Sequence, residues 1–170
     1  MISHMKKVAI VYYSRTGRTK ETAHLIKELL RGLEIQADVY GLRCVKEYGG
    51  NYIRMVIDTL LGRTTDYKIQ DGFKPSSYDL IIVGTPIWAG SISPPIRTFI
   101  MDNVSSMKNP IACFVTSKRR KNYSIKFRNF LTSLGYNVIA DITVVDSKVD
   151  SENIVKFVKE IAKSLNSTTK

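Results

Sequence analysis

Cysteine is scarce in this sequence, and long apolar runs are missing from it. Only two of the 170 residues are cysteine, and Cys44 and Cys113 form no C-x-x-C pair. This spacing excludes a disulfide scaffold and argues against a structural zinc site. No apolar stretch approaches the roughly 20 residues that a membrane-spanning helix needs. We therefore expect a cytoplasmic protein without a membrane span.

Proline and glycine are also infrequent, at five and ten residues, which argues against a disordered or low-complexity chain. Hydrophobic residues make up 44% of the sequence, enough for a sizeable core. Residues 1–5 lack the basic and apolar segments of a secretory signal, and a second methionine at position 5 suggests a vector remnant or a disordered extension. We assign residues 6–170 to a single domain, because no repeat or linker interrupts them.

Acidic residues are in the minority, 15 against 26 lysines and arginines, so the formal net charge is +11. The excess is regional. No acid lies between Asp102 and Asp141, where seven bases occur, and the first 20 residues hold five bases and no acid. A basic surface can simply aid solubility, but a localised excess favours an anionic partner such as a phosphate, a nucleic acid, an acidic protein or a membrane surface.

The periodicity of apolar residues indicates alternating strands and helices. Near-continuous apolar runs are typical of strands buried on both faces, and apolar residues three or four positions apart indicate helices. The order of elements predicts parallel strand–helix–strand units with helices on both faces of a sheet. The predicted strands cover residues 6–13, 35–42, 79–84, 111–116 and 138–145, and the predicted helices cover 19–31, 52–61, 94–101, 124–134 and 152–165.

The turns after the strands are the candidate binding sites, because ligands of an open parallel sheet bind beyond the carboxyl ends of its strands. The first such turn, residues 14–19 (S-R-T-G-R-T), directly follows a buried strand and begins a helix. Free N–H groups at a helix N-terminus, together with hydroxyls and arginines, can enclose a phosphate. The alternative is that Thr16 or Thr19 simply caps the helix. The turn lacks the G-x-G-x-x-G and P-loop patterns and contains no cysteine.

A second turn, residues 84–91 (G-T-P-I-W-A-G-S), follows the third strand and contains the only tryptophan of the chain, Trp88. Trp88 could be a core or lid residue. Tryptophan is costly to expose, however, and at this edge of a sheet a planar ligand can cover it by stacking. Gly90 would let the backbone approach such a ligand closely.

These two turns, read as V-A-I-V-Y-Y-S-R-T-G-R-T and I-I-V-G-T-P-I-W-A-G, resemble the flavodoxin family in its short-chain form, which binds flavin mononucleotide (FMN). The order of elements agrees over most of residues 6–165. The resemblance implies an α/β three-layer sandwich whose five parallel strands have the order 2-1-3-4-5, with helices on both faces. It also implies that FMN is the cofactor.

The resemblance further implies which residues hold the FMN. The phosphate would lie in the first turn, and the flavin ring would lie between the second turn and residues 116–123. The implied phosphate-binding residues are Ser14, Arg15, Thr16, Gly17, Arg18 and Thr19, with the two arginines at variable positions of the motif. The implied ring-binding residues are Thr85, Pro86, Ile87, Trp88, Ala89, Gly90, Thr116, Ser117 and Tyr123.

The third turn departs from the family's pattern. Residues 116–123 (T-S-K-R-R-K-N-Y) place four consecutive bases where flavodoxins have a glycine-rich and often acidic segment. The run could be a solvated charged surface. Beside a flavin it would instead stabilise the anionic reduced form and make the flavin less reducing, or recruit an anionic second ligand such as a nicotinamide dinucleotide phosphate. Tyr123 either stacks on the other face of the ring or caps the following helix.

The leading hypothesis for function is an FMN-binding flavoprotein that transfers electrons. No Ser-His-Asp arrangement, paired carboxylates or metal-ligand spacing stands out, so we predict neither a catalytic side chain nor a metal site. The partner would be a redox protein or NAD(P)H; with NAD(P)H, the chain would be an FMN or quinone reductase. A second class is a non-redox module that binds anions or nucleic acid through Lys118–Lys121. No nucleic-acid-binding motif accompanies these bases, so nucleic acid is the less favoured partner.

Overall fold

The structure is a computed structural model that describes residues 5–45 and 51–167, so most of the extension expected at residues 1–5 lies outside it. Strands and helices alternate along the chain, as the apolar periodicity predicts. They are β1 (Lys7–Tyr13), α1 (Arg18–Gly32), β2 (Gln36–Cys44), α2 (Tyr52–Leu60), β3 (Tyr67–Lys68), a short 3-10 helix (Pro75–Ser77), β4 (Leu80–Trp88), β5 (Ser91–Ile92), α3 (Pro94–Asp102), β6 (Ile111–Thr116), α4 (Tyr123–Ser133), β7 (Val138–Val144) and α5 (Ser151–Ser167).

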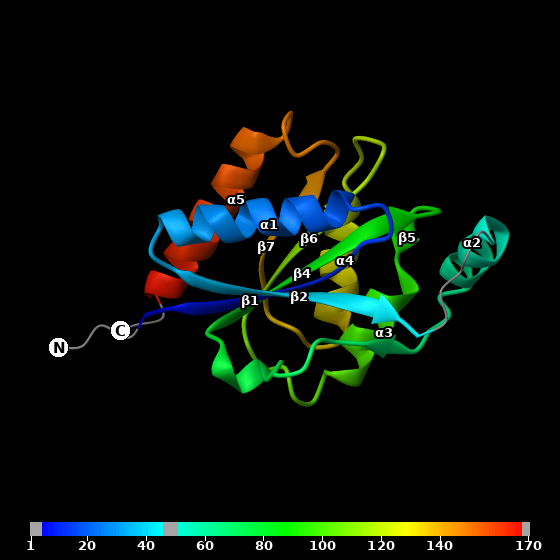
Figure 1. Ribbon diagram of the computed structural model, residues 1–170, viewed down its shortest axis with the longest axis horizontal. Helices are drawn as coiled ribbons and strands as arrows, with labels where there is room; N and C mark the ends of the chain where they lie inside the picture. The colour runs from blue at the N-terminus through cyan, green and yellow to red at the C-terminus, as the bar shows by residue number, and fades with distance from the viewer. Residues whose placement is uncertain (1–4, 46–50, 168–170) are drawn as a thin grey trace.

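The centre of the fold is a parallel sheet in the order β2-β1-β4-β6-β7, which is the predicted order 2-1-3-4-5. Helices α1 and α5 cover one face of this sheet, and α3 and α4 cover the other (Figure 1). The prediction of five strands is incomplete. Strand β3 pairs antiparallel with the end of β2, and β5 pairs antiparallel with the end of β4. Each has only two residues, too few to show a periodicity in the sequence.

The central strands are buried on both faces, which explains their near-continuous apolar sequences. In β1, Val8 and Ile10 pack in the cluster under α1 and α5, whereas Ala9 and Val11 pack in the cluster under α3 and α4. All four are fully buried. This alternation follows from the two-residue repeat of a strand.

Gly84 in β4 allows an aromatic ring to pack directly on the sheet. A Cβ atom at this position would lie 2.1 Å from the ring of Phe114, which is fully buried on the neighbouring strand β6. No side chain fits in that space. The glycine at the start of the second turn is therefore required by packing.

Helix α2 begins as the sequence predicts, and the Asn51 side chain accepts a hydrogen bond of 3.0 Å from the Arg54 N–H at its N-terminus. The apolar stripe of this helix nevertheless faces outward, whereas the stripes of the helices on the sheet face the core. Within the described residues, no helix combines the length and apolar character needed to cross a membrane.

Candidate functional site

The strand register brings the three predicted turns to one edge of the sheet. Tyr12 of β1 lies opposite Gly84 of β4, and Pro86 of β4 lies opposite Thr116 of β6. Because these strands are parallel, their carboxyl ends lie level with one another. The segments that follow them begin at neighbouring points.

The first turn is a tight loop that leaves the start of α1 uncapped by a side chain. The Gly17 N–H donates to Ser14 Oγ over 3.1 Å, and the Gly17 carbonyl accepts the first helical bond, from the Glu21 N–H. Gly17 itself is the N-cap, with a φ of 94°, so the alternative that Thr16 or Thr19 caps α1 is wrong. Arg15, Thr16 and Arg18 are exposed. The turn therefore combines backbone N–H groups and the positive end of the α1 dipole with two exposed arginines.

Thr19 and Thr116, both predicted as binding residues, are buried and contact each other. Their hydroxyl groups lie 2.7 Å apart, and the two residues are 1% and 3% exposed. Ser117 is buried as well, and its hydroxyl accepts a hydrogen bond of 3.1 Å from the Arg119 N–H. These three hydroxyl groups hold the first and third turns in place.

The second turn differs from its prediction. Strand β4 does not end at Gly84 but continues to Trp88, where it pairs antiparallel with β5, Trp88 opposite Ser91. Only Ala89 and Gly90 form the turn, with φ angles of 47° and 79°. Two central residues with positive φ define a type I′ hairpin, whose twist matches that of the strands it joins.

The base of this hairpin is fixed by a buried polar network. The Thr85 hydroxyl lies 3.0 Å from the Ser93 hydroxyl and accepts a hydrogen bond from the Ser93 N–H, and both residues are completely buried. Pro86 and Ile87 are half-buried. Thr85, which the sequence predicts as a ring-binding residue, is buried and supports the base of the hairpin.

Trp88 is half-buried and packs against Tyr13. Their ring centroids are 5.5 Å apart and the ring planes meet at 82°, an edge-to-face arrangement that is favourable for aromatic pairs. Tyr13 is the last residue of β1 and immediately precedes Ser14. The predicted phosphate turn and the predicted ring residue are therefore adjacent.

The basic loop is exposed at Lys118–Lys121, but one of its charges is neutralised. The Arg120 guanidinium donates to Asp150 Oδ1 over 2.9 Å, and Asp150 is 1% exposed. Its other oxygen, Oδ2, accepts from the N–H groups of Val145 and Asp146. Burial acts to raise the pKa of Asp150, but these backbone N–H groups and Arg120 outweigh it and hold the pKa below its ordinary value.

Tyr123 is the first residue of α4 and is partly packed against the core under α3 and α4. Asn122, not Tyr123, occupies the N-cap position, so the alternative of Tyr123 as a cap is wrong. The Lys126 ammonium lies 5.8 Å from the Tyr123 ring centroid. This places a further positive charge next to the basic loop.

Two cavities border the first turn. One, of about 630 Å³, lies between residues 16–18 and the loop 146–148 that follows β7. The other, of about 1270 Å³, runs from Ser14 and Arg15 along α1 and the outer edge of β2. The charged residues of the second are mainly basic, namely Arg15, Lys20, Lys27, Arg43 and Lys68 against Asp38 and Asp71.

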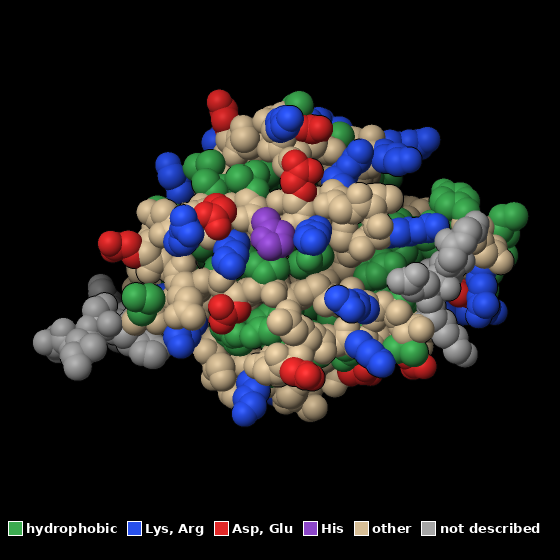
Figure 2. Space-filling model, viewed as in Figure 1, with side chains coloured by type: hydrophobic (Ala, Val, Ile, Leu, Met, Phe, Trp, Pro, Cys, Tyr) green, Lys and Arg blue, Asp and Glu red, His purple; other side chains and the backbone are tan. Residues whose placement is uncertain are grey.

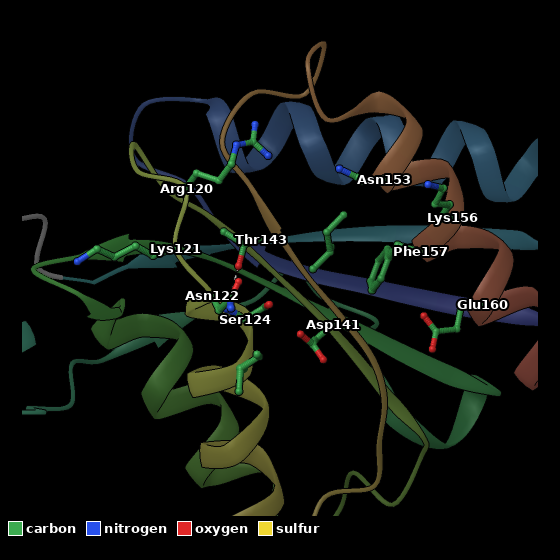
Figure 3. Close-up of a pocket in the computed structure, with 12 residues that line it drawn as sticks. Arg120, Lys121, Asn122, Ser124, Asp141, Thr143, Asn153, Lys156, Phe157 and Glu160 are labelled. Atoms are coloured by element: carbon green, nitrogen blue, oxygen red, sulfur yellow. Dashed lines mark hydrogen bonds between the residues drawn. The ribbon is translucent and has the colours of Figure 1, made fainter.

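A third cavity, of about 420 Å³, lies beside the open edge of β7 and was not anticipated from the sequence (Figure 3). Arg120 and Lys121 of the basic loop border it, and the Ser124 N–H donates to the Thr143 hydroxyl over 3.0 Å in its wall. Asp141 and Glu160 supply acidic groups on the other side (Figure 3). Three basic and two acidic residues line it, so its charge is more evenly balanced than that of the cavity along β2.

Comparison with known proteins gives a match in structure and not in sequence. No family model matches the chain, and no curated protein matches its sequence. A flavoprotein from Lactobacillus acidophilus NCFM in complex with FMN matches with a TM-score of 0.67 and 22% identity, over 87% of this chain and 97% of that one. The apo form of the flavoprotein from the same organism matches with a TM-score of 0.63 and 27% identity, over 87% of this chain and 97% of that one. A flavodoxin from the domain Archaea matches with a TM-score of 0.65 and 17% identity, over 94% of this chain and 99% of that one.

The chain has the flavodoxin-like fold. The similarity extends over nearly the full length of these structures, as the order of elements predicted. On this fold, the chain carries an outward-facing α2, a β4–β5 hairpin that contains Trp88, and a basic loop bonded to Asp150.

Proposed function

We propose that this chain binds FMN at the carboxyl edge of its sheet and transfers electrons. The contact between Tyr13 and Trp88, with ring centroids 5.5 Å apart, supports this most directly. It sets the start of an anion-binding turn beside a partly accessible aromatic ring. A ligand with a phosphate at one end and a planar ring system at the other can reach both. The same fold carries FMN in the flavoprotein from Lactobacillus acidophilus.

The first turn suits the phosphate of FMN. No atom lies within 4 Å of the position that a Cβ would take at Gly17, so the space beside the start of α1 is open. The helix N-terminus offers N–H donors, Thr16 adds an exposed hydroxyl, and Arg15 and Arg18 add positive charge. We assign phosphate binding to these groups, with Thr19 as a positioning residue.

The β4–β5 hairpin and the basic loop suit the ring. Trp88 is held edge-on by Tyr13, so its orientation is set before any ligand arrives. The Ala89–Gly90 turn presents backbone with little side chain next to it. We assign ring contact to Trp88 and this turn. Thr85, Thr116 and Ser117, which are all buried, support the walls.

FMN, when bound, supplies one- and two-electron transfer. The chain's own residues bind its phosphate, cover its ring and select the electron partner. Exposed cations surround this edge at Arg15, Arg18, Lys118, Arg119 and Lys121. We propose that the partner is anionic, an acidic redox protein or NAD(P)H, because such a field attracts negative charge and raises the rate of encounter.

FMN uptake tests the assignment. The purified chain, incubated with FMN and desalted, is expected to retain a yellow flavin spectrum with one FMN per chain. The double variant R15A/R18A is expected to bind FMN about tenfold or more weakly, since it removes two charges beside the phosphate. Riboflavin, which lacks the phosphate, should bind both forms equally. Arg31→Ala, at the far end of α1 with a side chain 77% exposed, is the matched control and should bind FMN normally.

The electron carrier and the reductase differ in their reaction with NADPH. We favour the carrier, for which mixing the FMN-loaded protein with NADPH leaves the flavin absorbance unchanged over many seconds. Loss of that absorbance within a few turnovers would assign the NAD(P)H-dependent reductase instead. A chain that takes up no FMN but binds nucleic acid with a steep salt dependence would overturn the whole proposal.

A further inference from the structure

Helix α2 exposes an apolar stripe that nothing in the described structure covers. The side chains of the stripe are between 45% and 72% exposed, and they recur at positions that share one side of a helix. Figure 2 shows hydrophobic side chains projecting at the end of the molecule where Figure 1 places α2. The stripe consists of Tyr52, Ile53, Ile57, Leu60 and Leu61.

The side of α2 that faces the protein is narrow. Met55 and Thr59, one turn apart, are 3% and 2% exposed, and the Thr59 hydroxyl donates to the Met55 carbonyl over 2.7 Å. An Arg15 guanidinium nitrogen lies 3.0 Å from the Met55 sulfur. Two residues thus seat the helix, and the broader apolar side is turned outward. An exposed apolar stripe of this extent marks an interaction surface.

Positive charge surrounds the stripe. Arg54 and Arg63 lie on α2 and just beyond it, and both pair with Asp58, at 3.9 and 3.1 Å. Asp58 is the only acid between positions 51 and 65. Two further arginines lie against the helix. Arg15 contacts Met55, and the Arg97 guanidinium lies 3.8 Å from the position that a Cβ atom would take at Gly62. The four arginines outnumber the single aspartate, so the region around α2 is net positive, with Arg54 and Arg63 on its exposed part and Arg15 on the side that faces the protein.

A second copy of the chain does not suit this surface. Two copies that met through α2 would bring their arginines together, which is unfavourable. The helix has nine residues and is therefore only ~14 Å long. Alone it is too small for the ~800 Å² that each partner buries in a standard interface. A projecting helix with aliphatic side chains, ringed by arginines, instead suits the boundary between anionic headgroups and acyl chains.

We propose that α2 docks this protein on an anionic lipid surface. Tyr52, Ile53, Ile57, Leu60 and Leu61 enter the headgroup boundary, and Arg54 and Arg63, whose side chains are exposed, contact the anionic headgroups. The proposal does not depend on FMN, so the FMN-free protein and the FMN-loaded protein should behave alike.

Vesicle co-sedimentation tests this docking. The full chain is mixed with vesicles of phosphatidylcholine, with or without about one third phosphatidylglycerol. We expect a partition coefficient at least about tenfold higher on the anionic vesicles, and a steep fall with added salt, because exposed charges are screened. Failure of the wild-type chain to bind anionic vesicles at low salt would overturn the proposal.

Two pairs of variants separate the apolar contribution from the charge contribution. I53S/L60S is expected to lower binding to anionic vesicles at least about tenfold. Its control, L33S/M101S, changes residues exposed to 44% and 49% that lie outside α2, at the end of α1 and on α3, and should bind normally. Arg54→Glu should also lower binding several-fold. Its control is Arg31→Glu, an exposed arginine that likewise pairs with an acid on its own helix.

Further measurements keep these outcomes distinct. Circular dichroism should show that every variant is folded, which is expected because each substituted side chain is exposed. Equal vesicle binding by I53S/L60S and the wild-type chain would overturn the role of α2. Sedimentation velocity that detects a dimer abolished by I53S/L60S, without vesicle binding, would reassign the stripe to self-association and overturn the proposal.

Discussion

The hydroxyl groups of Thr19 and Thr116 share a hydrogen bond of 2.7 Å, although 97 positions separate the two residues in the sequence. Thr19 lies in the first turn of α1, and Thr116 ends β6. Both residues are buried, so water cannot replace either partner. The bond ties the start of α1 to the start of the basic loop and sets the distance between two walls of the candidate site.

Removing both members of this pair should cost less stability than the two single removals added together. Thr116→Val leaves the Thr19 hydroxyl buried without its partner, and we expect a loss of about 1–3 kcal/mol in the free energy of unfolding. The double variant T19V/T116V should lose less than the sum of the two single variants. Urea unfolding of the FMN-free protein gives the free energy of unfolding of the wild-type chain, Thr19→Val, Thr116→Val and the double variant. Additive losses would mean that the two hydroxyls do not depend on each other.

Trp88→Ala should weaken FMN binding by about 1–3 kcal/mol, because the stacking surface of the indole is lost. Trp88→Phe keeps a ring and should retain most of the affinity. A fluorescence titration with FMN gives both dissociation constants. Thermal unfolding of the FMN-free variants serves as the control, since Trp88 also packs on Tyr13. Unchanged affinity together with a lower melting temperature would assign Trp88 to packing alone.

The sequence was sufficient for the central sheet because its strands are buried on both faces. The runs around Ile10, Ile82 and Phe114 are apolar without interruption, and each became a strand in the predicted place. The strand order came from the resemblance of two turns to flavodoxins and is confirmed. Strand β5 and the extension of β4 to Trp88 depend on a tight turn at Ala89 and Gly90, which local periodicity does not reveal.

Long-range contacts of the site were beyond the reach of the sequence. Arg120 lies in a run of four bases and shows no sign there that Asp150, 30 positions away, neutralises it. The stripe of α2 correctly predicted a helix, but periodicity shows only that apolar residues share a side. It does not show whether the protein covers that side. Burial of Met55 and Thr59 instead depends on how α2 sits against its neighbours.

Gly84→Ala should be severely destabilising, by more than about 3 kcal/mol, because the added Cβ would lie 2.1 Å from the Phe114 ring inside a close-packed sheet. Gly32→Ala is the matched control. No atom lies within 4 Å of its added Cβ, and alanine at this position in α1 should stabilise by up to about 1 kcal/mol. Urea unfolding compares the two variants. Adding Phe114→Leu to Gly84→Ala should recover part of the loss by making room.

Asp150 should make stability depend on pH in the acid range. Its pKa is lowered in the folded protein, because hydrogen bonds from the N–H groups of Asp146 and Val145 and from Arg120 outweigh the effect of burial. A lowered carboxyl pKa contributes stability that is complete above the ordinary value and is lost as the pH falls through the folded value. The wild-type chain should therefore lose this contribution below about pH 4.

Asp150→Asn removes the charge and should lower the free energy of unfolding by about 1.5–3 kcal/mol near pH 7. This is the usual range for hydrogen bonds to a charged group. The difference from the wild-type chain should shrink as the pH falls below about 4, where the carboxyl group of the wild-type chain is protonated as well. Arg120→Ala should cost less, about 0–1 kcal/mol, because the arginine side chain is 62% exposed and the backbone donors remain. Urea unfolding between about pH 3 and pH 7 measures all three forms. A cost of Asp150→Asn that stays constant across this range would show that the carboxylate charge contributes nothing, and that Asp150 acts only through its shape.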